Sequence, residues 1–187
     1  MKRILVCITG ASGAIYGVRS IEALNEANIE VHLVVSKWGK KTLQYETGVS
    51  MAELASKVHE VYDEENLAAK PASGSFHLDG MLIAPCSMKT LSSIANGFAD
   101  NLVSRAADCS LKEKKPLVLV TREAPLNLIH IRNMEKVVEA GATLFPASPA
   151  FWSKPSSIEE LVDSLVDRIL THLGINEETA IEWDGDI

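Results

Sequence analysis

Short apolar runs alternate with longer segments of helical period along this chain, and that alternation limits its possible folds more than any other feature. The runs are nearly continuous in hydrophobicity, as expected for strands that helices cover on both faces. They span residues 3–9, 30–35, 60–62, 80–84, 117–121 and 142–145. Helices are predicted at about 13–26, 38–46, 51–57, 87–96, 100–113, 128–140 and 157–173. This order predicts an α/β fold with a mainly parallel sheet.

Length and charge limit the classes of protein to which the chain could belong. Its 187 residues are 47% hydrophobic, enough to fill one core, so we expect one domain over 1–175 and a C-terminal tail over 176–187. The net charge of -7 and the lack of a Lys/Arg-rich run argue against a nucleic-acid partner. The apolar runs are too short to cross a membrane and the first residues lack the apolar core of a signal peptide, so we expect a cytoplasmic protein.

Cysteine and histidine give no sign of a metal centre or a disulfide framework. The three cysteines, Cys7, Cys86 and Cys109, include no Cys-x-x-Cys pair, and the five histidines show no ligand spacing. We therefore expect no metal.

The residues that follow each predicted strand are the candidates for ligand binding, because ligands of parallel sheets bind beyond the carboxyl ends of the strands. After the first strand come Gly10, Ala11, Ser12 and Gly13, where the glycines permit a tight turn and a helix N-terminus would attract a phosphate. The segment is not the Gly-x-Gly-x-x-Gly fingerprint, and Ser36 stands where a dinucleotide fold has its acidic residue, so a mononucleotide is favoured. A glycine turn that merely packs a helix on the sheet is the alternative.

The segment MLIAPCSMKT (81–90) runs from a strand through Cys86 into a helix. No neighbouring residue could act as its base, so we interpret Cys86 as a small, partly buried residue at the strand end and not as a nucleophile. We assign ligand contacts instead to Ser87, Met88, Lys89 and Thr90, for which ordinary helix capping is the alternative.

Charged residues in apolar surroundings form a second group of candidates. Arg122 and Glu123 directly follow the buried run LVLVT, at the active edge of a parallel sheet, which favours a function. Arg105 and Lys112 share a face of one predicted helix, and Arg168 flanks the apolar stripe of the last helix, although surface placement would explain these three as well.

Several segments together resemble the UbiX-type flavin prenyltransferases, including members associated with phenolic-acid decarboxylases. They include TGASGAIYG, SKWGKKTLQYET and the long block from GMLIAPCSMKT to LNLIHIRNM, and the resemblance extends over about residues 3–175. It implies a Rossmann-like three-layer sandwich in a homododecamer that joins reduced FMN and dimethylallyl monophosphate without a metal. The product, prenylated FMN, would serve a separate UbiD-type decarboxylase.

The resemblance also implies roles for individual residues. FMN would be bound by Gly10, Ala11, Ser12, Ser36, Ser87, Met88, Lys89, Thr90 and Arg122. The prenyl phosphate would be held by Arg105, Lys112, Trp152 and Arg168, and the functional acids would be Glu46 and Glu123. Positive side chains suit a phosphate leaving group, because its departure builds negative charge.

One position departs from the family pattern, since Trp152 stands where the family usually has Tyr. An indole donates only through its N–H, which leaves the preference between mono- and diphosphate substrates open.

Two other functions are considered: a flavin-dependent cysteine decarboxylase, which lacks support from the PCSMKT segment, and a non-catalytic FMN-binding subunit of a decarboxylase. The acid on which the decarboxylase acts does not enter this site, so this sequence does not specify which acid it is.

Overall fold

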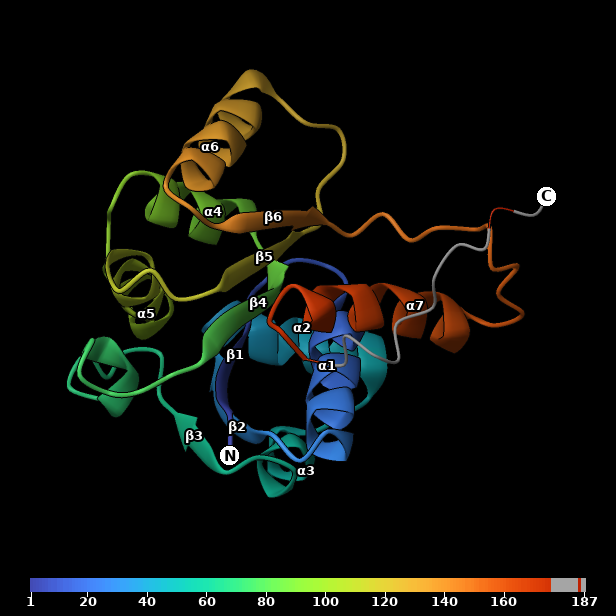
Figure 1. The fold of residues 1–187 in the computed structure, drawn as a ribbon, viewed down its shortest axis with the longest axis horizontal. Helices are drawn as coiled ribbons and strands as arrows, with labels where there is room; N and C mark the ends of the chain where they lie inside the picture. Colours follow the sequence, from blue (N-terminus) through green and yellow to red (C-terminus); the bar gives the residue numbers. More distant parts are fainter. Residues whose placement is uncertain (176–184, 186–187) are drawn as a thin grey trace.

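Six parallel strands form a single sheet in the computed structural model, which describes residues 1–175 and Gly185 (Figure 1). The strands are β1 (Arg3–Ile8), β2 (Glu30–Val35), β3 (Glu60–Tyr62), β4 (Gly80–Cys86), β5 (Leu117–Thr121) and β6 (Thr143–Pro146). Their order is β3-β2-β1-β4-β5-β6, so the chain runs outward in both directions from the β1–β4 pair. This is the doubly wound, Rossmann-like α/β arrangement that was predicted.

Helices cover both faces of the sheet and make it the middle of three layers (Figure 1). They are α1 (Ala14–Glu26), α2 (Lys37–Thr47), α3 (Met51–Ser56), α4 (Met88–Ala95), α5 (Leu102–Lys112), α6 (Leu128–Glu139) and α7 (Ile158–Thr171), with a short 3₁₀ helix η1 (Lys70–Ala72). On one face α1 packs against α2 and α7, and on the other α4 packs between α5 and α6.

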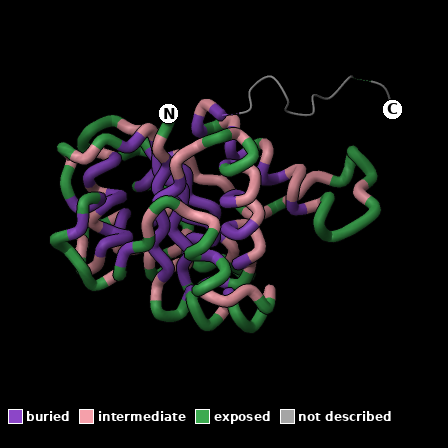
Figure 2. Tube along the Cα trace, turned by 90° about the horizontal axis from the view of Figure 1, so that it is seen from below, coloured by how far each residue is buried: buried purple, intermediate pink, exposed green. Residues whose placement is uncertain are grey.

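Each face of the sheet has its own hydrophobic core, because neighbouring strand residues point to opposite sides. In β1, Ile4, Val6 and Ile8 face α1 and α7, whereas Leu5 and Cys7 face α4 and α5. The buried residues fill the middle of the molecule and the exposed ones surround it (Figure 2).

Two details differ from the sequence-based expectation. Strand β4 continues past the predicted end at residue 84 to Cys86, because the β4–β5 pairing shifts register between Ile83 and Cys86 and needs no ladder hydrogen bond from Pro85. The segment 70–76, expected to be a loop, begins with η1. The tail predicted for 176–187 lies outside the described residues apart from Gly185. Among the described residues, no helix is long and apolar enough to cross a membrane.

Candidate active site

The loops singled out in the sequence meet at one edge of the sheet, because the carboxyl ends of all six parallel strands lie there. Thr9, directly after β1, joins two of these loops. Its buried hydroxyl donates to the carbonyl oxygen of Pro85 at 2.7 Å and accepts from the amide of Ser87 at 2.8 Å. These bonds hold the start of α4 beside the loop that follows β1.

The loop after β1 is organised by Glu46 from the end of α2. One oxygen of its carboxylate accepts from the amides of Gly13 (2.8 Å) and Ala14 (3.0 Å) at the N-terminus of α1. Burial alone would raise the pKa of Glu46, but the Ser12 hydroxyl, these two amides and the charge of Arg122 outweigh it and lower the pKa. The ionised carboxylate therefore occupies the anion position at this helix end, where the sequence suggested a phosphate.

Glycine is needed at two positions in this loop. Gly13 has φ +106°, in the left-handed region that other residues rarely adopt. At Gly10, a Cβ atom would lie 2.5 Å from the Cβ of Trp38 on α2, closer than two such atoms can approach. The bare backbone of Gly10 thus allows α2 to pack directly against the loop.

A cleft of about 470 Å³ opens between α2 and α4, a size typical of small-molecule sites. It is lined by Gly10, Ser36, Lys37, Trp38, Glu64, Glu65, Ser87, Lys89, Thr90, Asp100 and Asn101. Five of the nine residues assigned to FMN belong to this lining: Gly10, Ser36, Ser87, Lys89 and Thr90. The structure therefore brings most of that predicted set together.

Two helices direct their N-termini into this cleft. The Ser36 hydroxyl accepts from the amide of Gly39 at 3.0 Å and caps α2, and the Ser87 hydroxyl accepts from the amide of Thr90 at 3.3 Å and caps α4. The alternative of ordinary helix capping is therefore confirmed for Ser87, which also lines the cleft, and its contact with a ligand stays a prediction. The positive ends of two helix dipoles, with Lys89 beside them, suit a phosphate group.

The other predicted FMN residues lie around this cleft. Ala11 is a buried residue of the loop after β1, and the side chain of Ser12 in the same loop forms a hydrogen bond with Glu46. Met88 is half-buried, and its side chain packs against the core formed by α4 and α5. The contact of Met88 with a ligand therefore stays a prediction.

Arg122, after β5, carries a donor that has no partner among the described residues. Its Nε is buried and makes no hydrogen bond. Leaving such a group unpaired costs about 1–3 kcal/mol, which an acceptor on a bound molecule would recover. An anionic, acceptor-rich ligand such as FMN fits this donor and the capped helix ends of the cleft.

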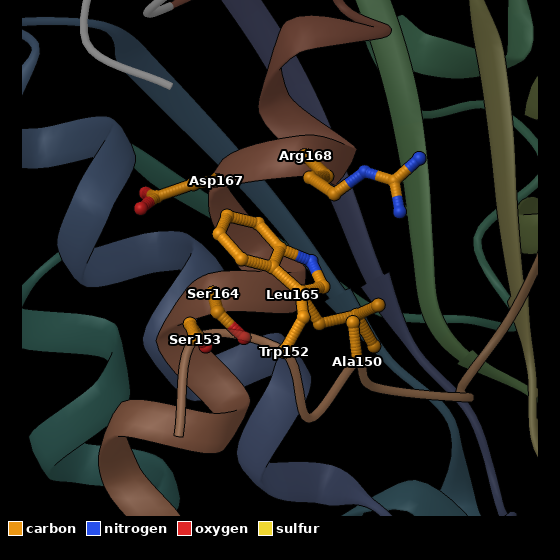
Figure 3. Close-up of a pocket in the computed structure, with 7 residues that line it drawn as sticks. All are labelled: Ala150, Trp152, Ser153, Ser164, Leu165, Asp167 and Arg168. Atoms are coloured by element: carbon orange, nitrogen blue, oxygen red, sulfur yellow. The ribbon is translucent and has the colours of Figure 1, made fainter. Parts of the chain in front are cut away.

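A second, smaller pocket lies between α7 and the segment before it (Figure 3). It is lined by Ala150, Trp152, Ser153, Ser164, Leu165, Asp167 and Arg168. Two of the residues assigned to the prenyl phosphate, Trp152 and Arg168, therefore share a pocket. Its volume of about 30 Å³ holds little more than a water molecule, so these residues alone do not enclose a five-carbon chain.

The other two residues assigned to the prenyl phosphate lie elsewhere on the same chain. Arg105 donates to the carbonyl oxygen of Ala72 (3.1 Å) and pairs with Asp108 (2.8 Å). Lys112 is exposed in the last turn of α5, just before β5 begins, whereas Arg122 follows the end of β5. The length of β5, about 17 Å, separates these two positions, so one chain does not assemble all the predicted cations.

The remaining two candidates differ in their surroundings. Glu123 is exposed at the edge of the site, and its carboxylate accepts from the amide of Ala124 at 3.0 Å. Cys86 is completely buried at the end of β4, and burial raises the pKa of its thiol to about 12. Cys86 is therefore no thiolate near neutral pH and lies at the strand end as predicted, but the expected partial burial was wrong, because β4 is covered along its whole length.

Several cleft residues were not found from the sequence. Trp38 could have been noticed, because it stands in the first turn of the helix after β2. Glu64, Glu65, Asp100 and Asn101 belong to loops without a recognisable motif, and the fold brings them to the cleft. A hydrogen bond from the amide of Lys37 to the carboxylate of Glu64 holds the loop after β3 beside the start of α2.

Comparisons with known proteins identify the family to which this chain belongs. The model of the flavoprotein family matches residues 1–170. Flavin prenyltransferase LpdB of Lactiplantibacillus plantarum is 49% identical over 187 residues, covering 100% of both chains. Flavin prenyltransferase UbiX of Escherichia coli (strain K12) is 44% identical and covers 99% of this chain and 100% of its own.

Solved structures agree with these relatives. AnUbiX (PadA1), crystallised in complex with FMN and dimethylallyl pyrophosphate, has a TM-score of 0.96 at 46% identity, with 100% of this chain and 99% of that chain covered. A dodecameric FMN-dependent UbiX-like decarboxylase from Escherichia coli O157:H7 has a TM-score of 0.94 at 43% identity, covering 98% and 100% of the two chains. The cysteine decarboxylase TvaF, at 16% identity and a TM-score of 0.68, shares the fold alone. The chain thus belongs to the flavoprotein family and, within it, to the UbiX-type flavin prenyltransferases.

Proposed function

We propose that this protein binds reduced FMN in the cleft between α2 and α4 and transfers to it a dimethylallyl group from dimethylallyl monophosphate. The observation that carries the proposal is that two capped helix N-termini open into one cleft, while at the same edge of the sheet Arg122, whose charge acts on Glu46, has a buried Nε without an acceptor among the described residues. A phosphate at the helix ends would extend the flavin along the edge of the sheet towards Arg122, Glu46 and Glu123.

The reduced flavin would supply two nucleophilic atoms, N5 and C6. The N5–carbon bond would form as the bond from the allylic carbon to the phosphate oxygen breaks, and the N5 proton would pass through the phosphate to the double bond of the dimethylallyl group. The tertiary carbon, made electrophilic by this protonation, would then bond to C6, which loses its proton. Arg168 and Trp152 bind the phosphate as it acquires charge, and cations held in place for this purpose lower the barrier. Glu123 accepts the proton that leaves C6, directly or through the departing phosphate. Glu46 keeps the loop after β1 in place for the reaction.

A second copy of the chain would complete the site. Within one chain Arg105 and Lys112 lie away from Arg168, and the pocket around Trp152 is too small for the substrate. We infer that a neighbouring subunit of a homododecamer supplies Arg105 and Lys112. Contact between subunits would also close the reaction off from water, which strengthens each charge interaction.

The wider role follows from the product. Prenylated FMN is a cofactor and not an end product, so we infer a UbiD-type decarboxylase as its recipient. A cytoplasmic location remains a prediction of the sequence.

Release of inorganic phosphate tests the proposed transfer. Under anaerobic conditions, wild-type protein should release phosphate from dimethylallyl monophosphate only when reduced FMN is present. With dimethylallyl diphosphate the leaving group is pyrophosphate, so the same assay with inorganic pyrophosphatase added measures which substrate Trp152 accepts. Phosphate release that does not depend on FMN, or no release from either substrate, would contradict the proposal.

Mixed oligomers test the shared site. Lys112→Ala and Arg168→Ala are each expected to be inactive alone. If the two residues act from different subunits, co-assembly of the variants creates some sites with both residues intact and restores part of the activity. Mixtures that stay inactive would show that both residues act from the same chain.

A further inference from the structure

A cluster of polar side chains lies at the amino-terminal edge of the sheet, away from the flavin cleft. Glu30 and His32 point to the same face of β2, because side chains two residues apart do so, and His59 directly precedes β3. One ligand-type atom from each of the three side chains lies within 4.8 Å of the other two. Glu30 opens β2 and Ser36 follows it, so the cluster is about 20 Å from the cleft.

A count of hydrogen atoms identifies one contact in this cluster that a metal ion can bridge. Three contacts of 2.8 Å run in series, from Glu30 Oε1 to His32 Nε2, from His32 Nδ1 to the Tyr62 hydroxyl, and from that hydroxyl to Glu60 Oε2. A neutral imidazole and a phenol supply only two hydrogens for the three contacts. The third contact, between His32 Nε2 and Glu30 Oε1, is bridged either by a second imidazole proton or by a metal ion in its place.

The end of the series determines where the gap falls. The carboxylate of Glu60 only accepts, so Tyr62 donates to it and must accept from His32 Nδ1. With a metal ion in place of a proton at Nε2, the lone pair of His32 Nε2 and the carboxylate oxygen of Glu30 face the same cation. Two electron-rich atoms at 2.8 Å in a buried position are stabilised by a cation that both can coordinate.

The side chain of His59 provides the third of the three ligands that a metal ion could bind in this cluster. His59 Nε2 lies 3.9 Å from Glu30 Oε1, and its amide donates to the carbonyl oxygen of Val31 at 2.8 Å, which fixes its backbone to β2. Ligands about 2.0–2.1 Å from a tetrahedral ion are about 3.3 Å apart, between the two separations found here. The side chain of His59 is 57% exposed, so ions and water can reach the cluster from solvent.

The charge of Arg3 influences which ion is preferred. Its Nε donates to Glu30 Oε1 at 2.6 Å, and its guanidinium is held 4.9 Å from the ring of Phe76. A hard ion such as Mg²⁺ relies on carboxylate charge, which Arg3 largely neutralises. Two imidazoles instead favour late first-row ions.

We propose that Glu30, His32 and His59 bind a divalent late first-row metal ion such as Zn²⁺, with water in the fourth position. Tyr62 orients His32 through Nδ1, as outer-shell partners of metal-bound histidines do. The ion would tie the edge strand β3 to β2. Histidine spacing gave no hint of this site, because its ligands come from two neighbouring strand segments.

Cobalt binding tests this site on full-length protein without an affinity tag, after treatment with a chelator. Co²⁺ should bind at one ion per chain with the absorption of a four-coordinate site, and Zn²⁺ should displace it. His59→Gln should lower the affinity at least about tenfold, and Tyr62→Phe by about 10- to 100-fold. His77→Gln, another exposed histidine beside a carboxylate, is the matched control and should bind as wild type does.

Three results would overturn the proposal: no saturable Co²⁺ binding to wild type, equal affinity in wild type and His59→Gln, or equal losses in His59→Gln and His77→Gln. FMN binding should be unchanged in His59→Gln, so the outcome is independent of the prenyltransferase proposal.

Discussion

Glu46→Gln should destabilise the protein in a pH-dependent way, because the carboxylate of Glu46 holds the loop after β1. It accepts three hydrogen bonds, from the Ser12 hydroxyl and from the amides of Gly13 and Ala14. A bond to a charged acceptor is worth about 1 kcal/mol more than a bond to a neutral one, which would give about 3 kcal/mol for three bonds. Solvent screening of this largely exposed side chain reduces the expected loss to about 1–2 kcal/mol at pH 7.

The sign of the pH dependence follows from the lowered pKa of Glu46. Folding lowers the pKa below its ordinary value of 4.5, so the carboxylate stabilises the fold above pH 4.5 and loses this effect as the pH falls through the folded pKa. The free energy of unfolding in urea, measured at one protein concentration from pH 7 to pH 3, should therefore differ most between wild type and variant at pH 7. Glu139→Gln, on the exposed side of α6, is the control and should behave as wild type at every pH. A loss that is equal at pH 7 and pH 3, or equal in the control, would refute this reasoning.

Three further substitutions test other parts of the site. Arg122→Ala should weaken FMN binding about 10- to 100-fold by flavin fluorescence, because it removes a buried donor that has no partner among the described residues. The exposed Arg132→Ala is its control, and equal affinities of wild type and Arg122→Ala would contradict the assignment. Gly10→Ala should destabilise the fold by about 1–3 kcal/mol in urea unfolding, since the added Cβ meets Trp38, and an unchanged midpoint would show that α2 can shift. Glu123→Gln should lose turnover and retain FMN binding; full activity would remove its role as proton acceptor.

The sequence predicted the sheet well because both of its faces are covered. Near-continuous apolar runs can form only buried strands here, and all six were located to within about two residues, the largest difference being at the end of β4. The helix over 157–173 was equally clear, since its apolar stripe is the buried side of α7. Parallel order then placed Ser36, Ser87 and Arg122 at one edge without further information.

The rest of the site depends on contacts that no local pattern encodes. Glu64 and Asn101 reach the cleft from loops more than 25 residues from Ser36 in the chain, and Glu46 replaces the expected phosphate at α1 through a contact between helices. For Lys112 the sequence did suggest phosphate binding, through its positive charge. It did not show that Lys112 lies away from Arg168 within one chain. The amino-terminal cluster around His32 was missed because it requires the pairing of β2 with β3.

The flavin product itself tests the central claim most directly. Purified protein is incubated without oxygen with reduced FMN and dimethylallyl monophosphate, and the released flavin is examined by mass spectrometry. A flavin heavier by one dimethylallyl unit is the expected result, and it would show that Trp152 supports the reaction. Bound but unmodified FMN, with the diphosphate also tried, would contradict the account and identify a flavin-binding protein without transferase activity.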